Sequence, residues 1–434
     1  MNGNITKDGI TRDLEAMKAN GIAGYQLFEA GSGIPIGPVE SLSDEWVDLI
    51  LHTLKESERL GLEFAMHNCP GWSSSGGPWI TPDKAMQIIT WSETKITGGK
   101  QVRIQLPTPK HMFDYYIDTY CLAIPANMKV IPRLSILELS NRLDKDGVLT
   151  WDVPTGEWLI MRFGQTAKDQ KNKSAPSKST GLDCDKFSTE ALDYHLNCMF
   201  KRLMPAMEKI AQHSKIGLLI DSYETGDQDW TSDMPAYFEQ SHGYELYPFL
   251  PVLANKIVES EESTKRFLFD FRRVRADMFA ERYYGHFQKR CKEKGIITYT
   301  EPYGGNMMEE LQVAQQLDIN MGEFWCGQTV LWANYKYNRT VKQVASIAHT
   351  LGGKVVGAEA FTSEPDADKW LQYPYALKSL GDYMFTRGLS RIYFHRFAHQ
   401  PHPTAAPGMT MGAWGLHFDR TNTCLLYTSD AADE

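Results

Sequence analysis

Short runs of apolar, β-branched residues recur along this chain, and several of the segments between them carry apolar residues at helical spacing. Residues 11–20 and 43–60 have the pattern of amphipathic helices, with Thr11 and Ser43 as the expected N-caps and a glycine just after each helix. Strands that alternate with helices at short intervals are typical of βαβ units and a parallel sheet. The expected strands are residues 24–29, 62–67, 216–221, 296–300, 319–323, 355–359 and 391–395.

The strongest helical pattern lies at residues 264–294. Its large apolar residues, among them Phe267, Phe271 and Val274, recur every three or four positions, and Gly295 follows. The intervals between the later strands suit successive βα units of a barrel. A barrel of eight strands needs one more than the pattern supplies, and residues 1–5 are expected to be the tail of a clipped first strand. The sequence therefore predicts an α/β fold, a (β/α)8 TIM-like barrel that is incomplete at its N-terminal strand.

The regular alternation is interrupted from residue 90 to residue 163, where short alternating segments are separated by turn residues. This pattern predicts an antiparallel β insertion after the third strand, if the clipped strand is counted as the first. The stretch 168–179, rich in Lys, Ser and Asn, is expected to be a mobile loop. We therefore divide the chain into the first part of the barrel at 1–89, a β-rich insertion with its loop at 90–186, and the remainder of the barrel at 187–423.

Charge and composition exclude several classes of partner. The chain has 54 acidic and 45 basic residues, a formal charge of −9, and no long basic tract, which argues against binding to nucleic acid or to an anionic membrane surface. No stretch is long and apolar enough to span a membrane. The seven cysteines form no CxxC pair, so neither a zinc site nor a disulfide framework is expected.

Acidic residues follow four of the expected strands at the point where each strand ends. They are Asp221 with Glu224, Glu301, Glu323 and Glu359. Charges next to buried strands are costly unless they are used, and the strand C-termini of a parallel barrel gather on the face that carries the chemistry. The alternative is a set of unrelated surface carboxylates. The repetition favours a shared site.

Glu224 and Glu359 are the candidate catalytic pair. Glycoside hydrolysis needs one carboxylic acid that protonates the leaving oxygen and a second carboxylate that activates water or attacks carbon. Glu224 lies in a tight turn after Asp221. A carboxylate beside other carboxylates can have its pKa raised, which suits a general acid. Glu359 is flanked by small residues that leave room for a substrate or a water molecule. The alternative is two solvated glutamates near loops.

Asp221, Glu301 and Glu323 are candidates for a hard-cation site or for acceptors of sugar hydroxyl groups. Calcium takes six to eight oxygen ligands in irregular geometry, so carboxylates from separate strand ends would serve. No calcium-loop spacing is present in the sequence. Ion pairs with Arg396 or Arg420 are an equally good explanation of these acids.

Two further segments are candidates for substrate binding. The first, His67–Ile80, begins with His67 and Asn68, is rich in glycine and serine, and carries Trp72 and Trp79, whose rings could cover a sugar face. It has no lysine in the position of a phosphate-binding loop. The second follows the last strand and contains His395 and Arg396, which could bind a metal or hydroxyl groups.

Together these segments resemble glycoside hydrolase family 106, the α-L-rhamnosidases. The resemblance covers residues 1–423, and the long glycine-tryptophan segment makes coincidence improbable. The residues that carry it are His67–Ile80 with Thr81-Pro82, Asp221–Thr231, Thr300–Gly305, Gly322–Trp325, Gly357–Thr362, Arg396–Pro403, Pro407–Met411 and Trp414–Arg420.

The resemblance implies a calcium-dependent glycoside hydrolase that releases terminal α-L-rhamnose from plant or complex glycans with inversion. On this basis Glu224 is the expected acid and Glu359 the expected base, with Asp221, Glu301 and Glu323 as metal ligands. His67, Asn68, Trp72, Trp79, His395 and Arg396 are the expected substrate-binding residues. Two alternatives stay open: an exo-glycosidase for another sugar, and a carbohydrate-binding barrel that has lost catalysis.

The resemblance also bears on both ends of the chain. Family members continue past residue 423 into further domains, whereas residues 424–434 look like a translated sequencing adapter, so this segment is expected to be non-native. Members also extend upstream and usually carry a secretion signal, which this sequence lacks. The chain is therefore expected to be a metagenomic fragment of a periplasmic or extracellular protein, truncated at both ends.

Overall fold

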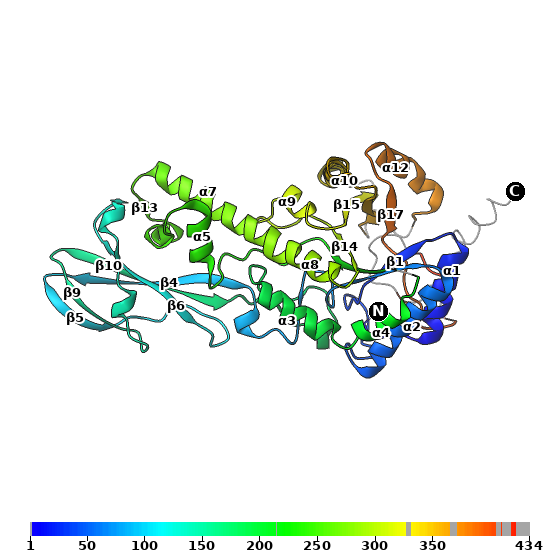
Figure 1. Cartoon of the computed structure of the whole chain (residues 1–434), viewed down its shortest axis with the longest axis horizontal. Helices are drawn as coiled ribbons and strands as arrows, with labels where there is room; N and C mark the ends of the chain where they lie inside the picture. The colour runs from blue at the N-terminus through cyan, green and yellow to red at the C-terminus, as the bar shows by residue number, and fades with distance from the viewer. Residues whose placement is uncertain are drawn as a thin grey trace.

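The computed structural model places a parallel barrel beside an antiparallel β extension (Figure 1). The structure describes residues 2–213, 215–326, 331–364, 371–404, 409 and 418–421, with only the backbone described at 331–338. Residues 424–434, the expected non-native tail, lie outside the described residues. Among the described helices, none is long and apolar enough to cross a membrane.

Seven parallel strands form the barrel sheet, in the order β1-β2-β12-β14-β15-β16-β17. All seven strands expected from the hydrophobic pattern are present, although their ends shift by up to four residues. Their bounds are β1 (Gly24–Leu27), β2 (Glu63–His67), β12 (Ile216–Ile220), β14 (Ile297–Thr300), β15 (Ile319–Cys326), β16 (Val356–Ser363) and β17 (Arg391–Phe394).

Alternate residues of these strands face the barrel interior and the surrounding helices, as the two-residue repeat of a strand requires. In β2, Ala65 packs inside the barrel with Leu219 and Tyr299, whereas its neighbours Phe64 and Met66 belong to the outer core. Gly217 is glycine for a local reason, because a Cβ atom there would lie 2.6 Å from the Tyr299 ring and 2.7 Å from the Ala65 side chain.

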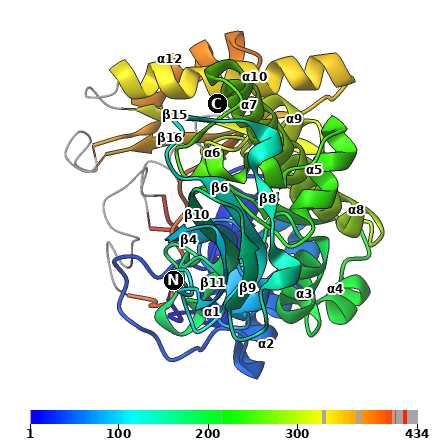
Figure 2. The same ribbon diagram turned by 90° about the vertical axis from the view of Figure 1, so that its left-hand side faces the viewer.

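Helices cover the outside of the sheet (Figure 2). The side chain of Ser43 accepts a hydrogen bond from Trp46 N and begins α2, and Gly61 ends this helix with a φ of 65°, as expected. The prediction that Thr11 is the N-cap of the first helix is wrong. The N-cap of α1 is Thr6, whose side chain accepts a hydrogen bond from Gly9 N. The helices of the barrel are α1 (Lys7–Ala19), α2 (Asp44–Leu60), α3 (Thr189–Phe200), α4 (Met204–Ile210), α7 (Glu261–Met278), α8 (His286–Lys292), α9 (Glu310–Ala314), α10 (Leu331–Leu351) and α12 (Pro374–Thr386).

The helix expected at residues 264–294 is interrupted. A π-helical segment, Phe279–Gly285, separates α7 from α8. It turns both Tyr283 and Tyr284, adjacent residues, into the core, where neither is exposed.

An antiparallel unit extends from the barrel between β2 and α3 (Figures 1 and 2). A small core around Cys121, Leu149 and Trp151 stabilises it. One sheet has the order β4-β10-β6-β8, and β5 pairs with β9 in a separate antiparallel two-stranded sheet. The bounds are β4 (Gln87–Thr97), β5 (Lys100–Gln105), β6 (Ile117–Pro125), β8 (Leu137–Glu138), β9 (Val148–Val153) and β10 (Glu157–Ala167).

Short elements join the two parts of the molecule. They are β3 (Gly76–Gly77) with β11 (Leu182–Asp183), β7 (Val130–Ile131) with β13 (Ile257–Val258), and the helices α5 (Met234–His242) and α6 (Leu250–Leu253). The stretch 168–179 is hydrogen-bonded to the barrel, since Trp72 N donates to Lys173 O at 3.2 Å and Gly31 N to Ser174 O at 2.8 Å.

The insertion follows β2, the second strand of the observed sheet, and not a third. Residues 2–6 have turn and irregular backbone, so they do not supply the expected tail of a strand. Among the described residues, no ladder joins β17 to β1, and the barrel wall has a seam between these two strands. The sheet is thus a nearly closed barrel of seven strands.

Candidate active site

All five predicted acids line one cavity of about 960 Å³, which also extends along the barrel to residues of α1, α2, β1 and β17. Asp221 follows β12 directly, and Glu224 lies three residues further, in the turn that leaves this strand. Glu301 follows β14, whereas Glu323 and Glu359 lie within β15 and β16. The parallel sheet therefore brings together carboxylates that are far apart in the sequence. Asp221 and Glu301 follow strand ends, as expected, whereas β15 and β16 continue to Cys326 and Ser363, so Glu323 and Glu359 are not at strand ends.

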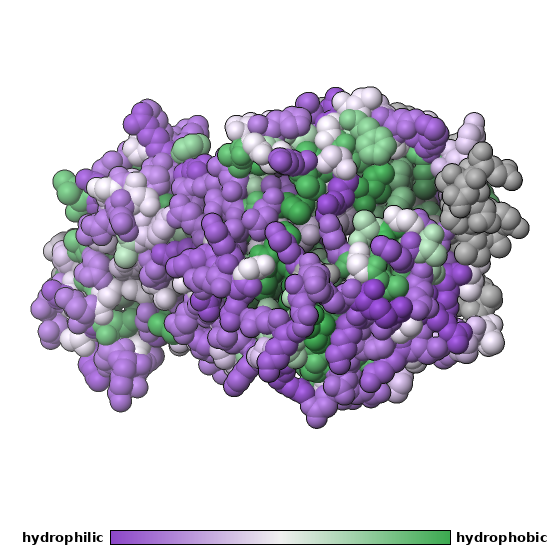
Figure 3. Space-filling model, turned by 45° about the vertical axis from the view of Figure 1, so that its right-hand side comes forward, coloured by the Kyte–Doolittle hydropathy of each residue, from purple (hydrophilic) through white to green (hydrophobic). Residues whose placement is uncertain are grey.

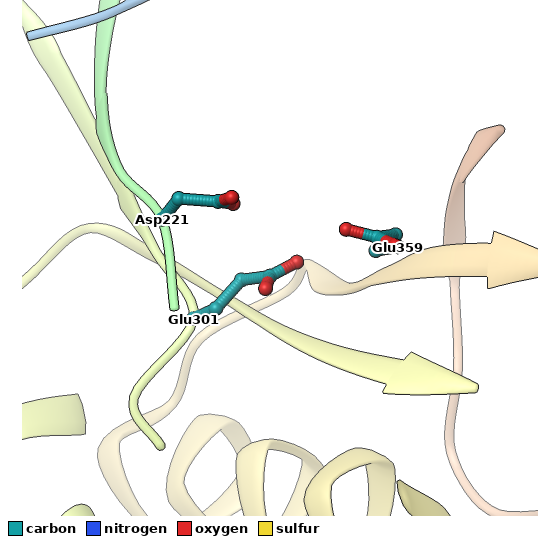
Figure 4. Close-up of side chains that lie close together, drawn as sticks. All are labelled: Asp221, Glu301 and Glu359. Carbon is teal, nitrogen blue, oxygen red and sulfur yellow. The ribbon is translucent and has the colours of Figure 1, made fainter. Parts of the chain in front are cut away.

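Three of these acids form the tightest group (Figure 4). One carboxylate oxygen from each of Asp221, Glu301 and Glu359 lies within 4.8 Å of the other two. Asp221 and Glu301 point across the strand ends toward Glu359. The Tyr303 hydroxyl donates to Glu301 Oε2, whereas Glu301 Oε1 is buried without a hydrogen-bond partner in the described structure.

Burial and mutual repulsion favour protons on this group. Burial contributes most, and the charge of Glu359 adds to it, so the pKa of Asp221 lies well above its ordinary value. Burial and the charge of Asp221 raise the pKa of Glu301 well above its usual range. Burial, with Glu359 beside it, raises the pKa of Glu323 to about 8. Like charges this close are stabilised together only by protons or by a cation.

The donor set fits a hard divalent cation. Carboxylate oxygens are the ligands that calcium prefers, and the unsatisfied Glu301 Oε1 is an acceptor available to an ion. The observed group contains Asp221 and Glu301, two of the three expected ligands, with Glu359 in place of Glu323. Glu323 lies next to Glu359, because the two residues are register partners in β15 and β16.

The base candidate and its neighbour are held in place by local hydrogen bonds. The Thr362 hydroxyl donates to Glu359 Oε1, and Trp325 Nε1 donates to Glu323 Oε1. Glu323 N also donates to Thr340 Oγ1 at 2.8 Å, which ties β15 to α10. These contacts restrict the rotamers of both carboxylates.

The acid candidate lies at the mouth of the cavity. The Glu224 side chain is 34% exposed and forms an ion pair with Lys173. Trp72 Nε1 lies 3.4 Å from Glu224 Oε2, and Ser222 Oγ lies 3.3 Å from Glu224 Oε1. Trp72 also lines the cavity.

His395 and Arg396, which follow β17, also line the cavity. Burial lowers the pKa of His395, and burial lowers the pKa of Arg396 to about 10. Arg420, an alternative partner for the acids, instead donates to Asp13 Oδ1 at 2.6 Å. Arg420 therefore does not position the five acids of the cavity, which we call the acidic rim.

The structure does not bring His67, Asn68 and Trp79 to the cavity lining. His67 Nε2 accepts from Asp221 N at 3.4 Å, and the Asn68 amide donates to Leu219 O at 2.9 Å. Trp79 Nε1 donates to a ring nitrogen of His195 at 3.3 Å. Their polar atoms are used inside the protein, so these residues shape the wall behind the acids.

Among the cavity residues that were not expected from the sequence, Lys173 and Trp325 contact the predicted acids. Lys173 belongs to the stretch interpreted as a loop, and backbone hydrogen bonds from Trp72 N to Lys173 O and from Gly31 N to Ser174 O hold it beside Glu224. Trp325 lies two residues beyond Glu323 in β15, and although its segment carries the family resemblance, only Glu323 in it was expected to belong to the site. An aromatic residue close to Glu323 in the sequence is the pattern that could have predicted Trp325. No sequence pattern indicated that Lys173 would reach the site.

Comparisons with known proteins identify a glycoside hydrolase family, although the activities in the names of the matches differ. A family model described as glycoside hydrolase 106, alpha-L-rhamnosidase, matches residues 1–119 and 110–430. The chain is 40% identical over 454 residues to a protein of Formosa agariphila named "Putative beta-glucuronidase", covering 98% of this chain and 38% of that protein.

One solved structure has the same fold. The rhamnosidase from Novosphingobium sp. PP1Y matches with a TM-score of 0.89 and 23% identity, covering 100% of this chain and 57% of that chain. The present chain thus spans about two fifths of the first relative and somewhat more than half of the second.

Proposed function

The chain belongs to glycoside hydrolase family 106, the alpha-L-rhamnosidases, and from this premise we propose that it releases terminal α-L-rhamnose from plant or complex glycans with inversion. The observation that carries the proposal is the position of Glu224 and Glu359 in one cavity, one carboxylate at its mouth and the other half-buried. A pair of carboxylates across a scissile bond is the requirement of glycoside hydrolysis.

In the proposed reaction, Glu224 gives its proton to the glycosidic oxygen while the bond from this oxygen to the anomeric carbon breaks. Glu359 takes a proton from a water molecule that attacks the same carbon on the opposite face. The transition state resembles an oxocarbenium ion, and the negative rim stabilises its charge. Inversion requires the two carboxyl groups to stand roughly 6.5–9.5 Å apart, which leaves room for the water.

We propose that calcium occupies the acidic rim. Asp221 and Glu301, two members of the observed group, would hold it, with Glu323, which lies within β15 as the register partner of Glu359, as the further carboxylate. When bound, the ion would supply positive charge that offsets part of the negative charge of these carboxylates and attracts sugar hydroxyl groups. The role of Trp72 is to cover one sugar face, and His395 and Arg396 contact hydroxyl groups from the β17 side.

A second candidate substrate is a uronic acid glycoside. The observation that favours it is Lys173, an ammonium group at the cavity mouth beside Glu224, which would pair with a sugar carboxylate. The Formosa agariphila relative carries the name of a glucuronidase. A carbohydrate-binding barrel without catalysis is the third possibility, and the two intact carboxylates argue against it.

The first experiment measures sugar release from an aryl α-L-rhamnoside and an aryl β-D-glucuronide, each with calcium and with a chelator. Rhamnose release that stops with chelator and returns with calcium supports the proposal. Release of glucuronic acid alone would replace the substrate, and binding without turnover of either glycoside would indicate a binding protein. Proton NMR of the first anomer released distinguishes inversion from retention.

We also propose that the whole protein acts in the periplasm or outside the cell, because polymeric glycans do not enter the cytoplasm intact. Fractionation of the source cells, with immunodetection of the protein, tests this location.

A further inference from the structure

A fully buried carboxylate, Asp183, lies behind the turn that carries Glu224. Asp183 is 0% exposed and belongs to β11, which pairs with β3 of the glycine-rich segment. Its two oxygens accept hydrogen bonds from Ser73 Oγ at 3.5 Å, Ser74 Oγ at 2.9 Å, Ser75 N at 3.3 Å, Lys186 Nζ at 3.2 Å and Thr225 Oγ1 at 2.5 Å. Asp183 does not line the cavity.

These bonds join the two segments that hold the acid. Thr225 is the residue directly after Glu224, and its hydroxyl donates to Asp183 Oδ2. Ser73 follows Trp72, and its carbonyl accepts from Glu224 N at 3.3 Å. Asp183 is therefore hydrogen-bonded to the residue after Glu224, Thr225, and to the residue after Trp72, Ser73.

The buried ion pair suits a role in geometry. Asp183 and Lys186 are both 0% exposed, and ion pairs in such places add little net stability, because desolvation offsets their attraction. Lys186 Nζ also donates to Ser75 O at 3.2 Å and to Cys184 O at 2.8 Å. Charge-assisted hydrogen bonds are short and directional, so this centre fixes the two segments relative to each other.

We propose that Asp183 is a positioning residue for Glu224, acting through the Thr225 hydroxyl. The proposal rests on the function of Glu224 as the general acid. A carboxyl group protonates a leaving oxygen only from hydrogen-bond distance, so movement of the turn weakens proton donation more than it weakens sugar binding. The effect depends on the leaving group, because a nitrophenolate departs without a proton, whereas an alkoxide requires one.

The test compares Thr225→Val with Thr231→Val, each measured on 2,4-dinitrophenyl and methyl α-L-rhamnoside. Thr231 is the matched control, because its hydroxyl donates to a different buried carboxylate, Asp185, at 2.8 Å. We expect Thr225→Val to lower kcat on the methyl glycoside about tenfold to hundredfold, part of the 10²–10⁴ that acid catalysis contributes. On the dinitrophenyl glycoside, and for Thr231→Val on both substrates, changes should stay within about threefold.

Thr225→Ser keeps the hydroxyl and should restore turnover of the methyl glycoside, and Thr225→Ala replaces the valine variant if that variant does not fold. A Thr225→Val variant that loses activity equally on both substrates, or on neither, overturns the proposal. Glu224→Gln, assayed in parallel, separates the two ideas. If Glu224→Gln loses activity mainly on the methyl glycoside and Thr225→Val does not, only the role of Asp183 is rejected. No selectivity in Glu224→Gln rejects Glu224 as the acid, and the role of Asp183 with it.

Discussion

Glu323 and Glu359 are direct neighbours in the parallel register of β15 and β16. Adjacent strands are about 4.8 Å apart, and register partners point to the same side of the sheet. Two carboxylates are therefore held side by side on the same rim as Asp221 and Glu301. The backbone of the barrel enforces this repulsion, and the rim needs protons or a cation to balance it.

Metal-free protein should lose stability as the pH rises. The pKa of Glu323 is raised from 4.5 to about 8 in the folded state, and an acid with a raised pKa binds its proton more tightly when folded. Its contribution is fully present below about pH 4.5 and is lost as the pH rises through 8. One pKa unit corresponds to about 1.4 kcal/mol, so the loss is several kcal/mol.

Thermal unfolding between pH 5 and 9, with chelator and with calcium, measures this effect. We expect calcium to flatten the profile, and Glu323→Gln to flatten it without calcium. A wild-type profile that is already flat in chelator would show that the rim is not electrostatically strained.

Loss of either catalytic carboxylate should abolish most turnover while the fold is kept. Glu224→Gln and Glu359→Gln each retain the side-chain shape but cannot transfer the proton, so kcat should fall by about 10²–10⁴. Steady-state kinetics on a methyl glycoside, with circular dichroism as the control for folding, provide the measurement. Full activity in Glu359→Gln would move the base to another rim acid.

The two tryptophans of the glycine-rich segment should respond differently. Trp72 lines the cavity beside Glu224, so Trp72→Phe should raise KM several-fold through the lost contact area and the lost indole donor. Trp79 donates to His195 behind the wall, so Trp79→Phe should lower the melting temperature and leave KM within about twofold. Equal effects on KM would contradict the assigned positions.

Acid should destabilise the protein through two buried histidines. Burial lowers the pKa of His67 to about 4 and that of His195 to about 3, so both are neutral in the folded state at neutral pH. A base with a lowered pKa contributes stability above its unfolded value near 6.5, and this stability is lost as the pH falls toward 4. For His67 the loss is about 3 kcal/mol.

Urea unfolding at pH 7 and pH 4.5 measures this loss. His195→Gln should reduce the difference between the two pH values, and His213→Gln, at a side chain that is 86% exposed, should leave it unchanged. The carboxylates of the cavity act in the opposite direction over this pH range, so the comparison with the variant decides: the same pH difference in wild type and in His195→Gln would rule out this source of acid sensitivity.

The sheet could be predicted because buried parallel strands require continuous apolar runs, and Leu218–Ile220 is such a run. The acids at strand ends could be predicted because the topology of a parallel sheet brings them to one face. The cap of α1 could not, since Thr6 and Thr11 have the same chemistry and only the backbone distinguishes them.

The roles of the glycine-rich segment could not be predicted, because partners distant in sequence decide them. Trp79 is fixed by His195, 116 residues later, and Ser74 by Asp183, 109 residues later. Trp72 has the same local composition around it, yet its partner Glu224 lies at the cavity mouth. Sequence pattern identified the segment, and tertiary contacts divided its residues between wall and cavity.

The seam between β1 and β17 affects the access of water to the carboxylates of the acidic rim. The cavity that holds Asp221 and Glu301 is also lined by Gly24 of β1 and by Tyr393 of β17, so it continues from the strand ends down to the seam. Water that enters at the seam raises the local dielectric constant and weakens every attraction and repulsion among the carboxylates. A segment of chain placed between β1 and β17 would exclude this water and strengthen the binding of a cation by the carboxylates. Closure of the barrel wall would therefore also change the electrostatics of the site.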